Sequence, residues 1–144
     1  MSEGQELLML IGLPASGKTT WAKRFCAERP EYVRISNDNL RVELFGPGAT
    51  YNPPREPHVT ALRRQRMGEA LAAGHSVVLD NMNMSGNAMR EAQWMARRHG
   101  VRLRFQRFDV PIGECIRRDG LRQRPVGAAV IRQMADLFRR KGYA

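Results

Sequence analysis

One short segment limits the possible folds of this chain more than any other. It matches the pattern GxxxxGK[ST] and reads Gly12-Leu13-Pro14-Ala15-Ser16-Gly17-Lys18-Thr19. An apolar run, Leu7 to Ile11, precedes it and is typical of a strand buried on both faces. The glycines allow the backbone to wrap closely around phosphate oxygens, and the first amides of a helix present N–H groups with a partial positive charge. The segment therefore predicts a strand, a phosphate-binding loop and a helix.

Short apolar strands and helical segments alternate along the rest of the chain. After the first strand, strands are expected at Tyr32 to Ile35, Ser76 to Leu79 and Val101 to Phe108, and helices at Lys18 to Glu28, Pro57 to Ala73, Ser85 to His99, Pro111 to Gly120 and Ala128 to Lys141. The alternation predicts one α/β domain over residues 1–144, a three-layer sandwich around a parallel sheet of about four or five strands. Ligands of such sheets bind at the carboxyl ends of the strands.

Two segments are expected to be mobile loops. Gly46 to Pro57 contains four prolines and two glycines, and Leu121 to Gly127 separates the last two helices. Both Trp21 and Trp94 are expected in the core, and Cys26 and Cys115 are expected to be reduced thiols.

The phosphate-binding loop predicts a nucleoside triphosphate, normally ATP, together with Mg²⁺. Lys18 is expected to reach the β and γ phosphates, and the hydroxyl of Thr19 is expected to ligate the metal ion. The residues expected to bind the nucleotide are Gly12, Pro14, Ala15, Ser16, Gly17, Lys18, Thr19 and Thr20.

A carboxylate at the end of a neighbouring strand is expected to help hold the metal ion. Asp80 directly follows Val77-Val78-Leu79, and we expect it to act through water. An aspartate after a strand is also a common turn former or helix cap, so that alternative stays open.

The second strand is followed by Ser36-Asn37-Asp38-Asn39-Leu40-Arg41. At this edge of a parallel sheet, Asp38 could accept the proton of an acceptor hydroxyl, and Arg41 could bind an acceptor phosphate. If a helix begins near Asn39, Asp38 is instead its N-cap and Arg41 is a solvated helix residue. The residues alone do not decide between these alternatives.

Taken in order, these segments resemble the 5′-kinase domain of phage polynucleotide kinase and the small P-loop kinases related to it. The similar stretches are the phosphate loop with Thr20-Trp21-Ala22, Asn37 to Arg41, Val77 to Asn83, and Phe108-Asp109-Val110-Pro111 leading to Arg122. The resemblance spans about residues 7 to 140. It implies a P-loop NTPase sandwich without the phosphatase domain of the phage enzyme.

The resemblance also implies roles for individual side chains. Asp38 would be the general base, and Arg41 would bind the acceptor phosphate. Arg122 would stabilise the transferring phosphoryl group from a mobile lid near residues 121–127. Without the resemblance, the favoured interpretation of Arg122 is a surface arginine among Arg117, Arg118 and Arg124.

The chain departs from the phage pattern on the acceptor side. Asn37 and Asn39 flank Asp38 where the phage pattern has a basic and an acidic residue, so the acceptor groove is expected to differ. Asn81 aligns with an acceptor-site aspartate, which leaves open whether Asp80 or Asn81 fills that position.

The charge balance is strongly basic, with 24 Lys and Arg against 14 Asp and Glu and a net charge of +10. Such a surface attracts polyanions, although an arginine-rich surface can also be merely solvated. With the resemblance, this balance favours a polynucleotide 5′-hydroxyl kinase acting on the 5′ ends of DNA or RNA in nucleic acid repair. The alternatives are a small-metabolite, nucleoside or antibiotic kinase of the same group, and a non-catalytic nucleotide-dependent module.

The sequence also bears on location and assembly. No apolar run approaches the ~18 residues of a membrane span, and Met1 to Gln5 lack the pattern of a secretory signal. We therefore expect a cytoplasmic protein that has no membrane partner. The oligomeric state is left open, with a homo-oligomer as one option.

Overall fold

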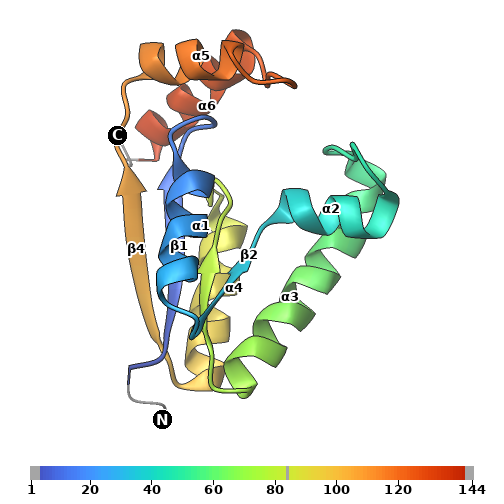
Figure 1. Cartoon of the computed structure of the whole chain (residues 1–144), viewed down its shortest axis with the longest axis vertical. Coiled ribbons are helices and arrows are strands. Elements are labelled where there is room, and N and C mark those ends of the chain that lie inside the picture. Colours follow the sequence, from blue (N-terminus) through green and yellow to red (C-terminus); the bar gives the residue numbers. More distant parts are fainter. Residues whose placement is uncertain (1–3, 84, 142–144) are drawn as a thin grey trace.

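Four parallel strands form the central sheet in the order β2-β3-β1-β4 within the part of the chain that the structure describes (Figure 1). The structure is a computed structural model that describes residues 4–83 and 85–141, so the two ends of the predicted domain 1–144 lie outside the described residues. The strands are β1 (Glu6–Gly12), β2 (Tyr32–Ile35), β3 (Ser76–Leu79) and β4 (Arg102–Phe108). The predicted fold class is confirmed, with four strands in the sheet.

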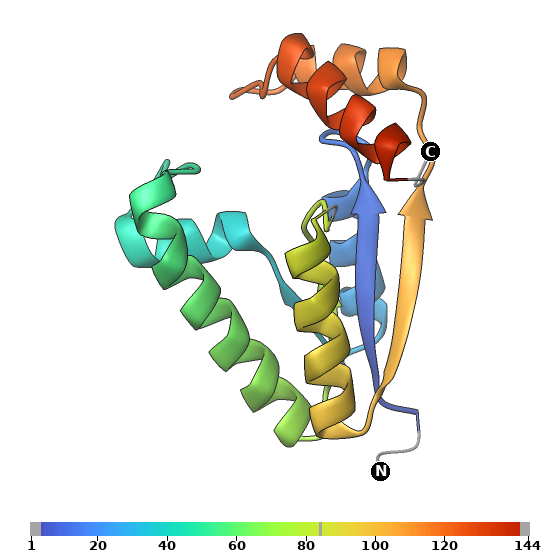
Figure 2. The ribbon, with the colours of Figure 1, turned by 180° about the vertical axis from the view of Figure 1, so that it is seen from behind.

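The helices lie on both faces of this sheet and beyond its carboxyl edge. They are α1 (Lys18–Glu28), α2 (Asn37–Phe45), the 3₁₀ turn η1 (Pro53–Arg55), α3 (Glu56–Ala72), α4 (Gly86–His99), α5 (Ile112–Gly120) and α6 (Ala128–Arg140). Figures 1 and 2 show α1 on one face and α3 and α4 on the other, which makes three layers. The same views show α5 and α6 beyond the carboxyl ends of β1 and β4, and α2 projecting from the end of β2.

Strand β1 is buried along its whole length because it is an inner strand with helices over both faces. Leu7 and Met9 pack in the core under α3 and α4, and Leu8 and Leu10 pack with Ala22 of α1 on the opposite face. Each such leucine contributes about 1.5–3 kcal/mol through burial. The continuous apolar run thus reflects two cores, one on each side of the strand.

One expectation about packing was wrong. Trp94 is 56% exposed and is not a core residue, and Phe105 is 43% exposed as well. Phe105 lies on β4, which is an outer strand of the sheet and is covered less than β1. Trp21 is partly buried and stacks on Phe25, with ring centroids 4.7 Å apart.

The loop expected from Gly46 to Pro57 is shorter than predicted. Residues Pro53–Arg55 form η1, and α3 begins at Glu56, with Pro57 in its first turn. Proline fits there because the first turn needs no N–H donor from it. Among the described residues, no helix has the length and apolar character needed to cross a membrane.

Candidate active site

The loop between β1 and α1 is shaped to hold phosphate. A Cβ built on Gly12 would lie 2.7 Å from Oγ of Ser16 and 2.9 Å from Cβ of Phe108, so the backbone leaves no room for a side chain. Gly17 has a φ of 97°, which favours glycine. In the described part of the chain, the Oγ atom of Ser16 is buried and has no hydrogen-bond partner. A phosphate oxygen would satisfy this hydroxyl, so the residues present fit a polyphosphate.

Lys18 points into the same loop. Its Nζ atom donates to the carbonyl oxygens of Gly12 and Leu13, each at 2.8 Å. Burial lowers the pKa of Lys18 to about 8, although the negative charge of Asp80 opposes that shift. A buried ammonium group that donates to neutral carbonyl oxygens favours a bound anion.

Asp80 lies at the end of β3 and is buried. Its Oδ2 atom accepts the hydroxyl of Thr19 at 2.9 Å, and it also accepts Nε and a terminal nitrogen of Arg34 at 2.9 and 2.8 Å. The helix-cap alternative for Asp80 was wrong, because Ser85 is the N-cap of α4. Sequence reasoning missed Arg34, whose place in a short strand carries no motif.

The metal site is sparse in protein ligands. Within residues 4–83 and 85–141 there is no group of three or more His, Cys, Asp or Glu side chains that could hold a metal ion. Thr19 and Asp80 nevertheless fit Mg²⁺, because this ion keeps several waters and uses few protein ligands when phosphate oxygens are present. The contact between Asp80 and Arg34 suits a carboxylate that acts through water.

Helix α2 carries Asp38 to the carboxyl edge of the sheet. Ser36 is its N-cap and accepts the N–H of Asn39 at 3.5 Å, so the alternative in which Asp38 caps the helix was wrong. Asp38 lies in the first turn, and its side chain is 87% exposed. Asn81, at the end of β3, accepts the backbone N–H of Asn37 at 2.8 Å and thereby ties the start of α2 to the central sheet.

Arg41 lies between two carboxylates. One terminal nitrogen donates to Oδ1 of Asp38 at 2.8 Å, while Nε and the other terminal nitrogen donate to Glu56 at 3.0 and 2.7 Å. The alternative of a solvated Arg41 was therefore wrong. The hydrogen bond from Arg41 lowers the pKa of Glu56, despite the opposing effect of partial burial. Sequence reasoning missed Glu56, because it lies 15 residues from Arg41 and no motif connects the two.

The segment from Leu121 to Gly127 is closed by Asp119. The buried carboxylate of Asp119 accepts the N–H groups of Val126 and Gly127, each at 2.9 Å, and it lies 3.4 Å from a terminal nitrogen of Arg122. Burial alone would raise the pKa of Asp119, but these three donors lower it overall. Asp119 thus fixes both ends of the segment that carries Arg122.

The arginines near this segment reach toward the site. A Cβ on Gly17 would lie 3.9 Å from a terminal nitrogen of Arg118, and a Cβ on Gly48 would lie 2.5 Å from one of Arg124. Arg118 therefore lies beside the phosphate loop, and Arg124 reaches the loop that follows α2. The charges of Arg122 and Asp38 both act on the pKa of Lys18, after the larger effects of burial and of Asp80. The contacts of two adjacent residues join the two ends, because Asp80 binds Thr19 of the phosphate loop and Asn81 binds Asn37 of α2.

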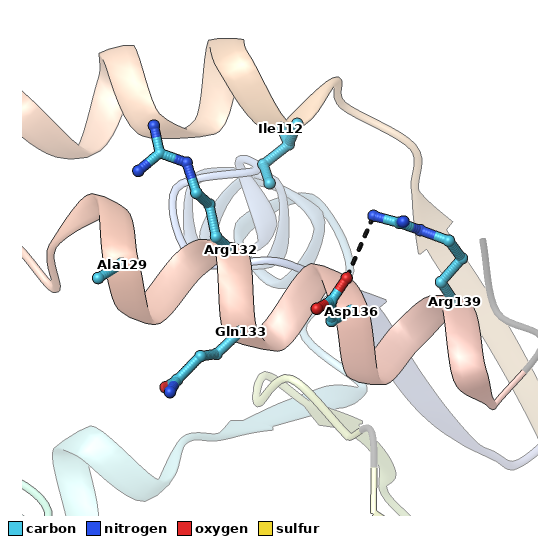
Figure 3. A pocket seen from close by; sticks show the side chains of 6 residues that line it. All are labelled: Ile112, Ala129, Arg132, Gln133, Asp136 and Arg139. Carbon is cyan, nitrogen blue, oxygen red and sulfur yellow. Dashed lines mark ion pairs between the residues drawn. The ribbon is translucent and has the colours of Figure 1, made fainter.

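A separate hollow lies on the face formed by α5 and α6 (Figure 3). It is lined by Ile112, Ala129, Arg132, Gln133, Asp136 and Arg139. In Figure 3, Asp136 and Arg139 form an ion pair, with 3.5 Å between the charged atoms. The hollow shares no residue with the phosphate loop or with Asp38, and we assign no function to it.

The fold and the site define a P-loop protein of the kinase class. The chain belongs to the AAA domain family AAA_33, whose profile matches residues 7–141. It is 28% identical over 131 residues to a protein of Autographa californica nuclear polyhedrosis virus that is named provisionally as a bifunctional polynucleotide kinase/RNA ligase. That alignment covers 83% of this chain but only 18% of the viral protein.

Two solved structures show how widely the fold is shared. A chain of the Pnkp1/Rnl/Hen1 RNA repair complex matches with a TM-score of 0.83 at 24% identity, over 96% of this chain and 45% of that one. A gluconokinase from Sinorhizobium meliloti 1021 matches with a TM-score of 0.61 at 17% identity, over 92% of this chain and 74% of that one. At these identities the matches establish the fold alone. The resemblance to polynucleotide kinases is confirmed, and small-molecule kinases share the same fold.

Proposed function

We propose that this protein is a polynucleotide 5′-hydroxyl kinase that transfers the γ-phosphate of ATP to the 5′ end of DNA or RNA. The observation that carries the proposal is the exposed carboxylate of Asp38, which Arg41 holds at the same edge of the sheet as the phosphate loop. The net charge of +10 and the likeness to the viral polynucleotide kinase/RNA ligase support a polyanionic acceptor.

The donor end comprises Gly12 to Thr20 together with Asp80. The backbone from Gly12 to Gly17, followed by Thr19 and Thr20, binds the phosphates of ATP, and Lys18 contacts the β and γ phosphates. Thr19 and Asp80 would hold Mg²⁺, which when bound neutralises phosphate charge. Arg34 keeps Asp80 oriented through its two hydrogen bonds.

The acceptor end comprises Asp38, Arg41, Glu56 and Asn81. Asp38 orients the acceptor hydroxyl toward the γ-phosphate and takes its proton. Arg41 binds an acceptor phosphate in a position set by Glu56. Asn81 fixes the start of α2 and completes this end of the site.

Arg122 acts on the transferring group itself. The transition state of phosphoryl transfer spreads negative charge over three equatorial oxygens, and an arginine placed beside them stabilises that charge. The segment from Leu121 to Gly127 serves as the lid that brings Arg122 there, within one domain.

The direct test is transfer of labelled γ-phosphate from ATP with Mg²⁺ to a 5′-hydroxyl oligonucleotide, beside the same oligonucleotide carrying a 5′-phosphate. Label is expected only on the 5′-hydroxyl strand, and it should be lost in Asp38→Ala. The matched control is Asp136→Ala, because Asp136 also pairs with an arginine three residues later on a helix but lies away from the site. Transfer that survives in Asp38→Ala would exclude this residue as the base.

A small-metabolite, nucleoside or antibiotic kinase is the second candidate, and the shared fold of the gluconokinase favours it. The same experiment separates the two. If ATP binds while no oligonucleotide is labelled, the polynucleotide proposal fails, and candidate small hydroxyl compounds should then be screened as acceptors. If Asp38→Ala changes neither nucleotide binding nor any nucleotide-dependent behaviour, a non-catalytic module remains.

A further inference from the structure

We infer that the outer face of α4, together with Arg64 of α3, binds the single strand of the acceptor beyond its 5′ end. The inference rests on the proposed function and adds a binding site for the part of the strand that follows its 5′ end. We call this surface the α4 face; it consists of Arg64, Arg90, Trp94, Arg97 and Arg98, all of which are exposed.

The centre of the α4 face is an exposed tryptophan. Trp94 is 56% exposed, and the guanidinium carbon of Arg98 lies 5.3 Å from the centroid of its ring. A large exposed ring beside arginine side chains offers a flat stacking surface next to positive charge. Proteins that hold single strands use this combination, in which a base stacks on an aromatic ring and arginines contact the backbone.

The α4 face is positively charged, which favours a polyanion as its ligand. Glu91 of the same helix already accepts two hydrogen bonds from Arg63 at 2.8 and 2.6 Å and one from Arg64 at 3.3 Å. Glu91, Trp94 and Arg98 are spaced i, i+3 and i+7, so they share one side of the helix. The acid is neutralised, and three exposed arginines of α4 that do not bind it remain on the same helix as the ring, with Arg98 over the ring itself.

The composition of the α4 face also argues for a polynucleotide over a protein partner. A stable protein interface has an apolar core surrounded by a polar rim. Here the five side chains include no aliphatic residue, and the tryptophan is surrounded by cations. The face therefore offers stacking and phosphate contacts without the means to build an apolar core.

A continuous set of contacts joins the α4 face to the acceptor end. Arg63, which binds Glu91, also donates to Oδ1 of Asn37 at 3.1 Å, and Asn37 precedes the proposed base Asp38. Helix α4 starts at Gly86, near the carboxyl edge, and Trp94 follows about 12 Å further along at 1.5 Å per residue. A dinucleotide held at Asp38 would end before Trp94, whereas a strand of about 16 nucleotides would extend over it.

Binding can be tested without any phosphoryl transfer. Trp21→Phe leaves Trp94 as the single tryptophan of a chain that has two, so its fluorescence reports the α4 face. A 16-nucleotide strand that already carries a 5′-phosphate is titrated in the absence of ATP. Saturable, salt-sensitive quenching is expected, and Arg98→Ala in the same background should weaken the affinity several-fold.

The matched control for that titration is Arg29→Ala. Arg29 is also an exposed arginine over an aromatic ring, 4.3 Å from the centroid of Phe25, but it follows α1 on the opposite face of the sheet (Figures 1 and 2). The α4 face is excluded if no quenching occurs, or if Arg29→Ala weakens binding as much as Arg98→Ala does.

Kinetics with two acceptor lengths separates this inference from the proposed function. Trp94→Ala should raise KM for the 16-nucleotide acceptor roughly 5- to 150-fold, the loss of one stacked base, with kcat retained. KM for a dinucleotide acceptor should change far less. Equal effects on both lengths would overturn the inference while leaving the kinase proposal intact. If the wild-type protein labels neither acceptor yet Trp94 is still quenched, the kinase proposal fails and the binding face stands.

Discussion

The donor and acceptor ends of the site are built from different kinds of contact. At the phosphate loop the polar groups are buried and contact backbone atoms, as Lys18 does with two carbonyl oxygens. At the acceptor end an exposed carboxylate, Asp38, is held by Arg41, which in turn is held by Glu56.

The two ends should therefore respond differently to substitution. A buried cradle depends on close packing, so its changes should alter folding and nucleotide binding together. At the acceptor end, changes at the exposed Asp38 should alter transfer and acceptor binding while the fold persists, because an ion pair of an exposed side chain contributes little to stability. Arg122, which is proposed to act on the transferring group, should affect transfer alone.

The largest effect is expected for Arg122→Ala. Loss of an arginine that stabilises the transferring phosphoryl group should lower kcat by roughly 10³- to 10⁵-fold. Affinity for ATP and KM for the acceptor should change little, which single-turnover transfer and equilibrium ATP binding would measure. Arg117→Ala is the control, since Arg117 is an exposed arginine on α5 that pairs with Glu114. A matching loss of ATP affinity would assign Arg122 to the donor end instead.

Gly12→Ala tests the close packing of the donor end. The added methyl would lie 2.9 Å from Cβ of Phe108, so neighbouring backbone must shift, which costs about 1–3 kcal/mol of unfolding free energy. ATP binding should fall with it. Gly120→Ala is the opposite case, because it adds a methyl to a helix with nothing within 4 Å and should stabilise by about 0.4–1 kcal/mol. Chemical denaturation of both variants checks the contrast, and an unchanged Gly12→Ala would show a looser cradle than the distances indicate.

How much the sequence reveals also differs between the two ends. The phosphate loop of the donor end consists of residues adjacent in the chain, so the pattern from Gly12 to Thr19 was enough to predict it, and Asp80 was proposed because it ends an apolar strand. The acceptor end depends on Glu56, which lies 15 residues from Arg41 across a loop that contains η1. No local spacing connects those two residues.

Exposure was predicted less well than the elements themselves. The helix that carries Trp94 was predicted correctly from the sequence. Burial was expected because tryptophan is a large apolar residue, but the side chain lies on the exposed side of that helix. Phe105 fits strand alternation, yet β4 is an outer strand, which only the order of the sheet reveals. Asp119 precedes Val126 by seven residues, and nothing in that spacing signals that it closes a loop.

Glu56→Gln tests the network at the acceptor end. The substitution removes the negative charge that holds Arg41 in place, so KM for the acceptor should rise several-fold. A hydrogen bond to a charged group is worth about 1.5–3 kcal/mol, and the variant loses only part of that energy. The free energy of unfolding should fall by at most about 1.5–3 kcal/mol, because the pair is largely buried and the glutamine can still accept one of its hydrogen bonds. Glu43→Gln is the control, since Glu43 on α2 pairs with Arg66 on α3 away from Asp38. Loss of ATP affinity in Glu56→Gln would mean that the two ends are not separate.

The smallest effect concerns the proton on Lys18. Its pKa is about 8 in the folded protein against 10.5 for an ordinary lysine, because burial disfavours the ammonium form. Between these values the unfolded chain binds more protons than the folded one, so unfolding free energy should rise as pH increases from 8 to 10.

Between pH 8 and pH 9 the gain is at most about 1 kcal/mol, since one pH unit corresponds to about 1.4 kcal/mol for a full proton. Lys18→Met should lack this rise, and urea denaturation of both proteins without nucleotide would measure the difference. ATP affinity should fall over the same range in the wild-type protein, because the ammonium that binds phosphate is lost. A parallel pH dependence of stability in both proteins would show that Lys18 keeps its ordinary proton affinity, and hence that the donor end is more open to water than its contacts indicate.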